Sequence, residues 1–208
     1  MPLEFQPSLL DLGAESSLGD LAEVERSVLS RGAWVDHLPG WVRGADAIFA
    51  DLVEQIPWRA EQRPMYERVV EVPRLVHTYG IGVELPHPVL TAARDALNAH
   101  YRAELGEEFV TAGCCFYRDG ADSVAWHGDN LGRGRIDDTM VAIVSFGTPR
   151  RLLLRPKGGP CELAFHLGHG DLVVMGGSCQ RTWEHAIPKT ARPVGPRISI
   201  QFRPRNVF

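Results

Sequence analysis

Two patterns of apolar and polar positions divide the chain near residue 110. Before that point, apolar residues recur at helical spacing in residues 45–56 and again in residues 88–105, with Pro57 ending the first segment. After it, short runs rich in Val, Ile and Phe are separated by Gly or Pro, which is typical of strands joined by turns. The predicted strands are 113–118, 124–127, 140–147, 151–155, 161–166, 171–175, 181–186 and 197–203. Eight short strands with no helix between them favour a sandwich or jelly roll.

We therefore expect an α+β protein whose core is a double-stranded β-helix, or jelly roll, with N-terminal helices packed on one sheet. The 208 residues suit a single domain. Residues 1–110 would form its helical N-terminal part and residues 111–208 its β core. Residues 1–40 are predicted to be irregular, and residues 69–79 to form two short strands split by Pro73.

Composition narrows the class of protein only a little. The formal charge of -4 gives no broad basic field, although a local Arg-lined groove would be hidden in that sum. The four cysteines include no CxxC pair, which disfavours a structural zinc site and fits reduced thiols. No apolar run is long enough to cross a membrane, and residues 1–12 lack the pattern of a secretion signal. We expect a cytoplasmic monomer with no membrane partner.

The segment Trp126-His127-Gly128-Asp129 carries the strongest chemical signal. In an extended segment the side chains of His127 and Asp129 point to the same face, so both can reach one ion. His185 is the best third ligand, because two His and one carboxylate leave the opposite side of the ion open, as in non-haem Fe(II) oxygenases. Two alternatives stay open: His166 or His169 could replace His185, or the ligands could form a cupin-type metal site.

The segment Arg197-Ile198-Ser199-Ile200-Gln201-Phe202-Arg203 alternates strictly between apolar and polar residues. Arg197 and Arg203 therefore share one face of a strand, about 20 Å apart at their Cα atoms. Buried arginines need anionic partners, and the gap between their side chains suits a small dicarboxylate with a keto group that could chelate a metal. The phenol of Tyr117 could donate to the same molecule. Alternatively, both arginines are solvated at opposite strand ends and Tyr117 is a core residue.

Five blocks of this sequence resemble the AlkB-like Fe(II)/2-oxoglutarate-dependent dioxygenases in order and spacing. The blocks are residues 117–120, 126–129, 170–177, 183–189 and 196–203. The resemblance implies that Fe(II) is bound by three side chains and that 2-oxoglutarate and O2 are cosubstrates. The implied Fe(II) ligands are His127, Asp129 and His185. The implied 2-oxoglutarate-binding residues are Arg197 and Arg203, which take the two carboxylates, with Tyr117 and Ser199 beside them.

The resemblance also implies a reaction and a partner: oxidative demethylation of N-alkylated nucleobases in DNA, with RNA as an open alternative, in the repair of alkylation damage. It assigns residues 1–110 a lid that faces the nucleotide. The implied substrate-binding residues are Trp58, Arg74, Tyr79, Trp126 and Leu131. Against this, Tyr79 could be a core residue of a strand and Arg74 a surface charge.

Three positions depart from the pattern of many members. Cys115 and Ser199 stand where Asn is common, which removes amide donors near the cosubstrate. Leu131 stands where an acidic residue is common near the substrate base, while Arg133 and Arg135 could contact phosphates. Two other functions therefore stay open. The same core could hydroxylate a small molecule or a protein side chain, or the chain could be a catalytically silent module that binds nucleic acid.

Overall fold

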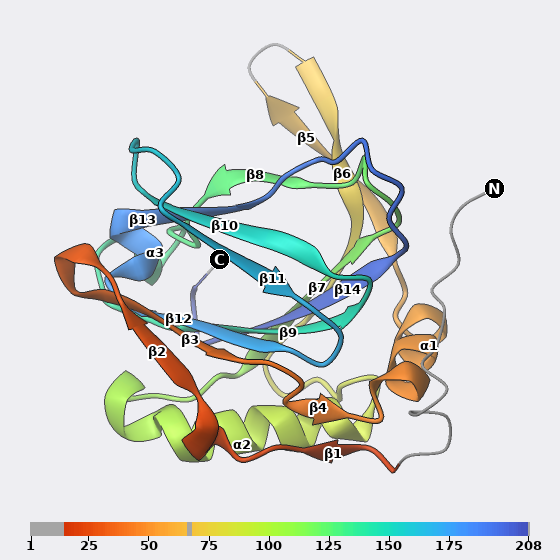
Figure 1. The fold of residues 1–208 in the computed structure, drawn as a ribbon, viewed down its shortest axis with the longest axis horizontal. Coiled ribbons are helices and arrows are strands. Elements are labelled where there is room, and N and C mark those ends of the chain that lie inside the picture. Colours follow the sequence, from red (N-terminus) through yellow and green to blue (C-terminus); the bar gives the residue numbers. More distant parts are fainter. Residues whose placement is uncertain (1–14, 66–67, 208) are drawn as a thin grey trace.

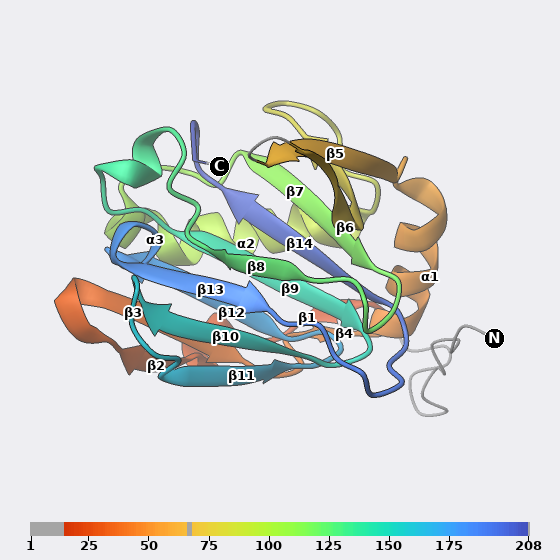
Figure 2. The ribbon, with the colours of Figure 1, turned by 90° about the horizontal axis from the view of Figure 1, so that it is seen from above.

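Two antiparallel β-sheets face each other in the computed structural model, which describes residues 15–65 and 68–207 (Figures 1 and 2). The strands are β1 (Ser17–Leu18), β2 (Glu25–Val28), β3 (Ala33–Leu38), β4 (Val42–Arg43), β5 (Arg59–Met65), β6 (Arg68–Tyr79), β7 (Thr111–Tyr117), β8 (Val124–His127), β9 (Val141–Gly147), β10 (Arg150–Pro156), β11 (Leu163–Leu167), β12 (Leu172–Gly177), β13 (Trp183–Ile187) and β14 (Arg197–Arg203). The helices are α1 (Ala45–Gln55), α2 (Pro88–Leu105) and α3 (Cys179–Thr182), with 3-10 turns η1 (Leu21–Glu23), η2 (Ser30–Gly32) and η3 (Arg133–Arg135).

The arrangement of the strands is that of a jelly roll. The large sheet has the order β2-β3-β12-β9-β14-β7-β6-β5, and the small sheet has the order β11-β10-β13-β8. All eight predicted strands after residue 110 are present, as β7 to β14, with ends within two residues of those expected. The expectation of no helix among them is wrong, because α3 lies between β12 and β13.

The first 110 residues are less helical than expected. Four of their strands, β2, β3, β5 and β6, extend the large sheet at its two edges, so this region belongs to the same β framework. The predicted break at Pro73 is also wrong, since β6 runs through it. Pro73 lies where the register between β5 and β6 shifts, a place where a strand tolerates a residue that cannot donate a ladder hydrogen bond. Residues 1–14, which include the segment tested for a secretion signal, lie outside the described residues.

Strand β14 separates two apolar cores. Its residues Ile198, Ile200 and Phe202 belong to a core cluster that also contains residues of α1 and α2. Figure 1 shows α2 running below the large sheet, on the side away from the small sheet. The second core lies between the sheets and includes Tyr117 and Leu154. The polar residues of β14 therefore point into the space between the sheets.

Local sequence explains where the long helix α2 begins and ends. Pro88 occupies its first turn, and the Nδ1 atom of His87 accepts a hydrogen bond from the amide of Val89 at 3.2 Å. Gly106 ends the helix with a φ of 75°, a conformation that glycine adopts readily. The described helices include none that is both long enough and apolar enough to cross a membrane.

Candidate active site

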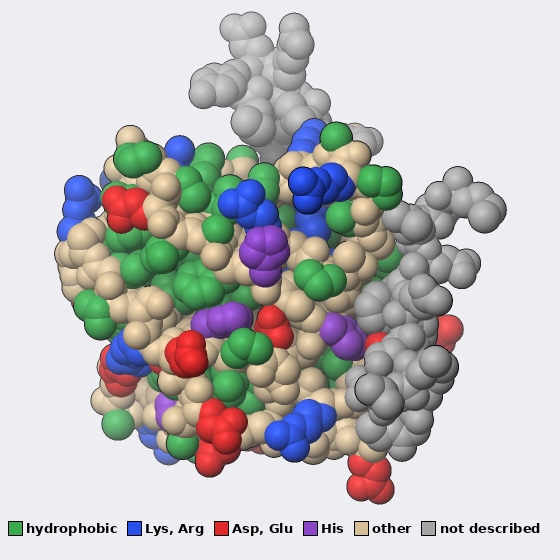
Figure 3. Space-filling view, in the orientation of Figure 1, with side chains coloured by type: hydrophobic (Ala, Val, Ile, Leu, Met, Phe, Trp, Pro, Cys, Tyr) green, Lys and Arg blue, Asp and Glu red, His purple; other side chains and the backbone are tan. Residues whose placement is uncertain are grey.

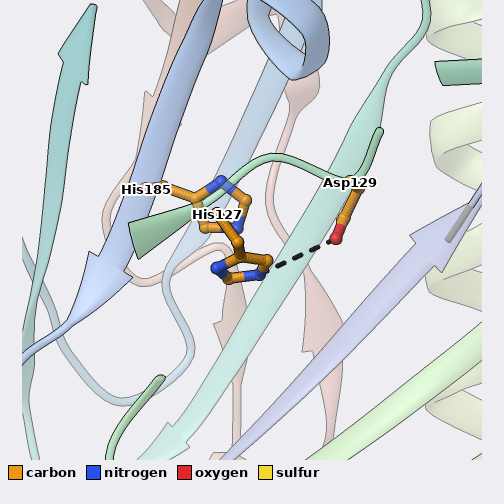
Figure 4. A group of neighbouring side chains, drawn as sticks. All are labelled: His127, Asp129 and His185. Atoms are coloured by element: carbon orange, nitrogen blue, oxygen red, sulfur yellow. Dashed lines mark ion pairs between the residues drawn. The ribbon is translucent and has the colours of Figure 1, made fainter. Parts of the chain in front are cut away.

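Three predicted metal ligands meet between the sheets. Strand β13 pairs with β8 so that His185 lies directly opposite His127, with ring centroids 4.2 Å apart. One potential ligand atom from each of His127, Asp129 and His185 lies within 4.8 Å of the others. Figure 4 shows the three side chains converging, with Nε2 of His127 3.8 Å from Oδ1 of Asp129. Sheet pairing thus brings the ligand that is remote in sequence to the other two.

The backbone around His127 and Asp129 is held tightly. The carbonyl of Ala125 lies 2.8 Å from Nδ1 of His127, which leaves Nε2 free to face an ion. A Cβ atom at Gly128 would lie 2.3 Å from the carbonyl oxygen of Gln180, so only glycine fits here. The side chain of Gln180 accepts a hydrogen bond from the amide of Asp129 at 3.0 Å. Helix α3 therefore fixes the turn that carries the carboxylate.

The protonation states suit metal binding. Burial, together with the nearby His127, lowers the pKa of His185 to about 3, so this imidazole is neutral at pH 7. Burial by itself would raise the pKa of Asp129, but Arg203 and the two histidines lower it to about 2. A neutral imidazole and an ionised carboxylate are the forms that bind a cation.

The alternative third ligands lie elsewhere. His169 has its Nδ1 atom 2.7 Å from the amide of Gly147 and its Nε2 atom 3.0 Å from Asp46 of α1. His166 is exposed on β11. Neither belongs to the group of potential ligands found among the described residues.

The same cavity contains an arginine with unused donors. Arg197 is 1% exposed, and its Nη2 atom donates to Oγ of Ser145 at 2.8 Å. Its Nε and Nη1 atoms have no hydrogen-bond partner among the described residues. Burial lowers the pKa of Arg197, as expected for a cation removed from water. A buried guanidinium with two free donors is matched by a carboxylate, which can accept two parallel hydrogen bonds.

Tyr117 completes this end of the cavity. It lies opposite Arg197 in the pairing of β7 with β14, and its ring centroid is 5.2 Å from the Cζ atom of Arg197. Burial raises the pKa of Tyr117 to about 12, so the phenol keeps its proton and can donate it in a hydrogen bond. Arg197 and Tyr117 are therefore suited to hold a carboxylate.

Arg203 lies at the end of the cavity that contains the three potential metal ligands, where it pairs with Asp129. Its Nε atom donates to Oδ2 of Asp129 at 3.0 Å. Space for its guanidinium comes from Gly113 on β7, where a Cβ atom would lie 2.5 Å from Nη1 of Arg203. The alternative that the two arginines are solvated at strand ends is wrong, because both line the cavity.

Ser199 and Arg74 also line this cavity. The hydroxyl of Ser199 accepts a hydrogen bond from Nε2 of Gln201. The Nε atom of Arg74 lies 3.3 Å from Sγ of Cys115, and its Nη1 atom donates to the carbonyl of Ser123 at 3.1 Å. Arg74 is therefore part of the cavity wall, and the alternative that it is a surface charge is wrong.

Three of the predicted substrate-binding residues do not line the cavity in this structure. Tyr79 is 8% exposed and belongs to the core on the helix side of the large sheet. Trp58 packs against that same core, with its ring 5.3 Å from Phe116. Trp126 lies under the guanidinium of Arg155, which pairs with Glu184, on the outer side of the small sheet. For Tyr79 on β6 and Trp126 on β8, the two-residue alternation of a strand places the side chain on the face away from the cavity.

Leu131, by contrast, is 65% exposed in the loop that follows Asp129. Two supporting residues were not predicted from the sequence. They are Gln180, which binds the backbone at Asp129, and Arg150, which donates to the carbonyls of Asp119, Asp122 and Pro188 behind Tyr117. Neither stands in a recognisable motif, and only their contacts in the fold identify them.

The known proteins that this chain resembles are 2-oxoglutarate-dependent oxygenases. A family model described as 2OG-Fe(II) oxygenase superfamily matches residues 36–203. The chain is 31% identical over 193 residues to the alpha-ketoglutarate-dependent dioxygenase alkB homolog 3 of Homo sapiens, which covers 79% of this chain and 64% of that protein. It is 31% identical over 133 residues to the DNA oxidative demethylase ALKBH2 of Arabidopsis thaliana, covering 53% of this chain and 42% of that protein. The chain thus spans less than two thirds of the length of either relative.

Proposed function

This chain belongs to the 2OG-Fe(II) oxygenase superfamily as an AlkB-like dioxygenase, and we propose that it oxidatively demethylates N-alkylated nucleobases in nucleic acid. The family uses Fe(II), 2-oxoglutarate and O2. One observation carries the proposal: the His-Asp-His group and the unpaired donors of Arg197 open into the same cavity. A metal and a dicarboxylate can therefore be bound next to each other.

The residues present fit both groups. His127, Asp129 and His185 would hold Fe(II), and Arg197 with Tyr117 would hold a carboxylate of 2-oxoglutarate. With O2, the bound pair supplies the oxidation that converts an N-methyl group into an N-hydroxymethyl group, which then leaves as formaldehyde.

The protein's own side chains position the reactants and keep water out. Arg203 holds the Asp129 carboxylate, and Tyr117 offers a phenolic proton to an anion. Ile143, Leu152 and Ile187 form an apolar part of the cavity wall. Such a wall excludes water and strengthens the electrostatic interactions inside.

Nucleic acid is the substrate class that the relatives favour, since two of them are named DNA oxidative demethylases of plant and human origin. A base inside a duplex cannot reach a metal between two sheets, so it would have to leave the stack. On the η3 turn after Asp129, the exposed charge of Arg135 supports a contact with phosphates, whereas Arg133 is paired with Glu107. Figure 3 shows charges of both signs on one face, with Lys and Arg side chains toward the edge nearest the β5–β6 hairpin.

The test is formaldehyde release from N-methylated DNA and RNA oligonucleotides with Fe(II), 2-oxoglutarate and O2. We expect formaldehyde and succinate in equal amounts, and neither product from Asp129→Ala. If no methylated oligonucleotide yields formaldehyde, the proposal is wrong. Succinate formation stimulated by a small molecule or a peptide would then assign the chain to the alternative hydroxylases.

A catalytically silent binding module is the weaker alternative. Such a module has no use for three converging ligand groups beside a buried guanidinium with free donors. Metal content after anaerobic purification distinguishes the two, because the proposed enzyme retains one Fe(II) per chain and a silent module retains none.

A further inference from the structure

One cysteine opens into the candidate active site. Of the four cysteines of the chain, only Cys115 lines the cavity that contains the potential metal ligands. Its neighbour Cys114 belongs to the core on the helix side of the large sheet, because successive residues of β7 point to opposite faces. Burial raises the pKa of Cys114 and of Cys179, and buried thiols of this kind are unreactive. Cys161 is exposed at the surface.

The sulfur of Cys115 is held at a defined place in the cavity wall. Strand β6 pairs with β7 so that Val76 lies opposite Cys115, and Arg74, two residues before Val76, shares that face. The Nε atom of Arg74 lies 3.3 Å from Sγ of Cys115. On its other side, Sγ lies 3.7 Å from Oε1 of Gln201, to which the thiol can donate. A guanidinium group therefore faces the sulfur directly.

A second, independent observation shows that an anion fits beside this sulfur. The charged groups among the described residues that line the cavity, apart from the histidines, are Arg74, Arg197, Arg203 and Asp129. Asp129 pairs with Arg203, and the exposed Glu61 interacts electrostatically with Arg74. Arg197 is 1% exposed, and its Nε and Nη1 atoms have no hydrogen-bond partner among the described residues. Arg197 also interacts electrostatically with Cys115, so an anion that it binds lies near Sγ.

We propose that Cys115 is a site of covalent modification by electrophiles that carry a carboxylate. Arg197 holds the carboxylate and so keeps the reactive carbon close to the sulfur. With an α,β-unsaturated dicarboxylate, the sulfur forms a C–S bond to one alkene carbon, and the thiol proton is replaced by a proton added to the other. The addition needs no oxidant and has no leaving group.

The modified side chain occupies the cavity in which 2-oxoglutarate is expected to bind, so modification and cosubstrate exclude each other. The proposal does not depend on which substrate is demethylated. It depends on a sulfur at a position where many related sequences have Asn, so it is specific to chains with Cys here.

Iodoacetate and iodoacetamide test the proposal, because they alkylate sulfur by the same displacement of iodide and differ in charge. The full chain is loaded with Mn(II) without O2, and the rate of modification at Cys115 is measured by mass spectrometry of its peptides. The reference is the ratio of the two rates for N-acetylcysteine amide, a small neutral thiol. We expect the ratio of iodoacetate to iodoacetamide to be higher at Cys115 by about tenfold or more, because a positively charged cleft concentrates anions. A ratio equal to that of the free thiol would overturn the proposal.

Protection by the cosubstrate is the second measurement. At a 2-oxoglutarate concentration about ten times its dissociation constant, modification of Cys115 should slow by about tenfold, since only the unoccupied protein reacts. Modification of Cys161 should not change. Equal rates at Cys115 with and without bound 2-oxoglutarate would place the sulfur outside the anion site and overturn the proposal. The measurement uses no nucleic acid, so its outcome is independent of the demethylase function.

Fumarate tests the addition itself. After incubation with fumarate and its removal by gel filtration, wild type should carry one fumarate at Cys115 and lose 2-oxoglutarate binding in proportion to the fraction modified. Cys161→Ser is the matched control and should lose binding as the wild type does, whereas Cys115→Ser should lose none through the treatment. Full 2-oxoglutarate binding by wild type modified at Cys115, or no adduct at Cys115, would overturn the proposal.

Discussion

The Nε atom of Arg203 lies 3.0 Å from Oδ2 of Asp129, so a cation on β14 orients a carboxylate that follows β8. Arg197, six residues earlier on the same face of β14, instead has two donors without a described partner. The two arginines of one strand therefore differ in their tasks. Arg203 is paired with one of the three potential metal ligands, whereas Arg197 has two donors available to an anion.

Arg197→Lys and Arg203→Lys are expected to differ in their effects on 2-oxoglutarate binding and metal binding. Arg197→Lys should weaken 2-oxoglutarate binding by about tenfold to a hundredfold and leave metal affinity nearly unchanged, because one buried charged hydrogen-bonding group is altered. Arg203→Lys should weaken both. Titration calorimetry with Mn(II) and then with 2-oxoglutarate, without O2, measures the two affinities. Equal loss of metal affinity in both variants would contradict this division.

Gln180 is predicted to position Asp129. Gln180→Ala removes the acceptor of the Asp129 amide, so the turn at Gly128 loses a fixed point and metal affinity should fall by about fivefold to tenfold. The neighbouring Arg181→Ala, which removes a partly exposed ion pair with Asp138, is the control and should bind metal nearly as the wild type does. If both variants bind metal equally well, Gln180 has no positioning role.

Gly113 is predicted to make room for Arg203. In Gly113→Ala the new methyl group meets Nη1 of Arg203 and Oε1 of Gln201, so the guanidinium has to move. We expect the KM for 2-oxoglutarate to rise by about tenfold, with a smaller loss of thermal stability because the displaced groups are ends of side chains. Gly80→Ala, with its nearest contact at 3.9 Å, is the control. An unchanged KM in Gly113→Ala would show that Arg203 tolerates the displacement.

The identity of the third ligand can be tested by removing each histidine. His185→Ala should abolish stoichiometric metal binding, because two remaining ligands hold Fe(II) poorly. His169→Ala should retain the metal and lose some stability, since His169 contacts Gly147 and Asp46. Metal analysis after anaerobic gel filtration checks both. Metal retained by His185→Ala and lost by His169→Ala would reverse the assignment.

Protonation of Asp122 is predicted to lower the stability of the folded protein in acid. Burial would raise the pKa of Asp122, but hydrogen bonds from the side chain and backbone of Arg118 lower it below the ordinary value. A carboxyl group with a lowered folded-state pKa contributes stability above its unfolded pKa of about 3.9, and this contribution is lost as the pH falls through the folded-state value. Thermal unfolding between pH 6 and pH 3 should therefore show a smaller decline in Asp122→Asn than in wild type. An exposed control, Glu162→Gln, should decline as the wild type does.

The framework of the fold could be predicted because it depends on local periodicity. Short runs of Val, Ile and Phe between turn residues gave all eight strands after residue 110, and helical spacing gave α1 and α2. The N-terminal strands were harder to predict. Strands β2 and β3 lie in a stretch expected to be irregular, and they are held by pairing with a sheet whose strands come later in the chain. Pairing with a strand that comes much later in the chain cannot be predicted from the residue pattern of a short segment.

The sequence by itself determined the chemistry of the site. The spacing of His127 and Asp129 placed two ligands on one face, and the alternation of residues 197–203 placed two arginines on one face of a strand, because strand geometry repeats every two residues. Only the tertiary structure decided which distant histidine joins them and which face of each strand meets the cavity. Alternation defines two faces of a strand without saying which is covered by helices. The sequence therefore could not show that, of two residues on β6, Tyr79 packs on the helix side and Arg74 lines the cavity.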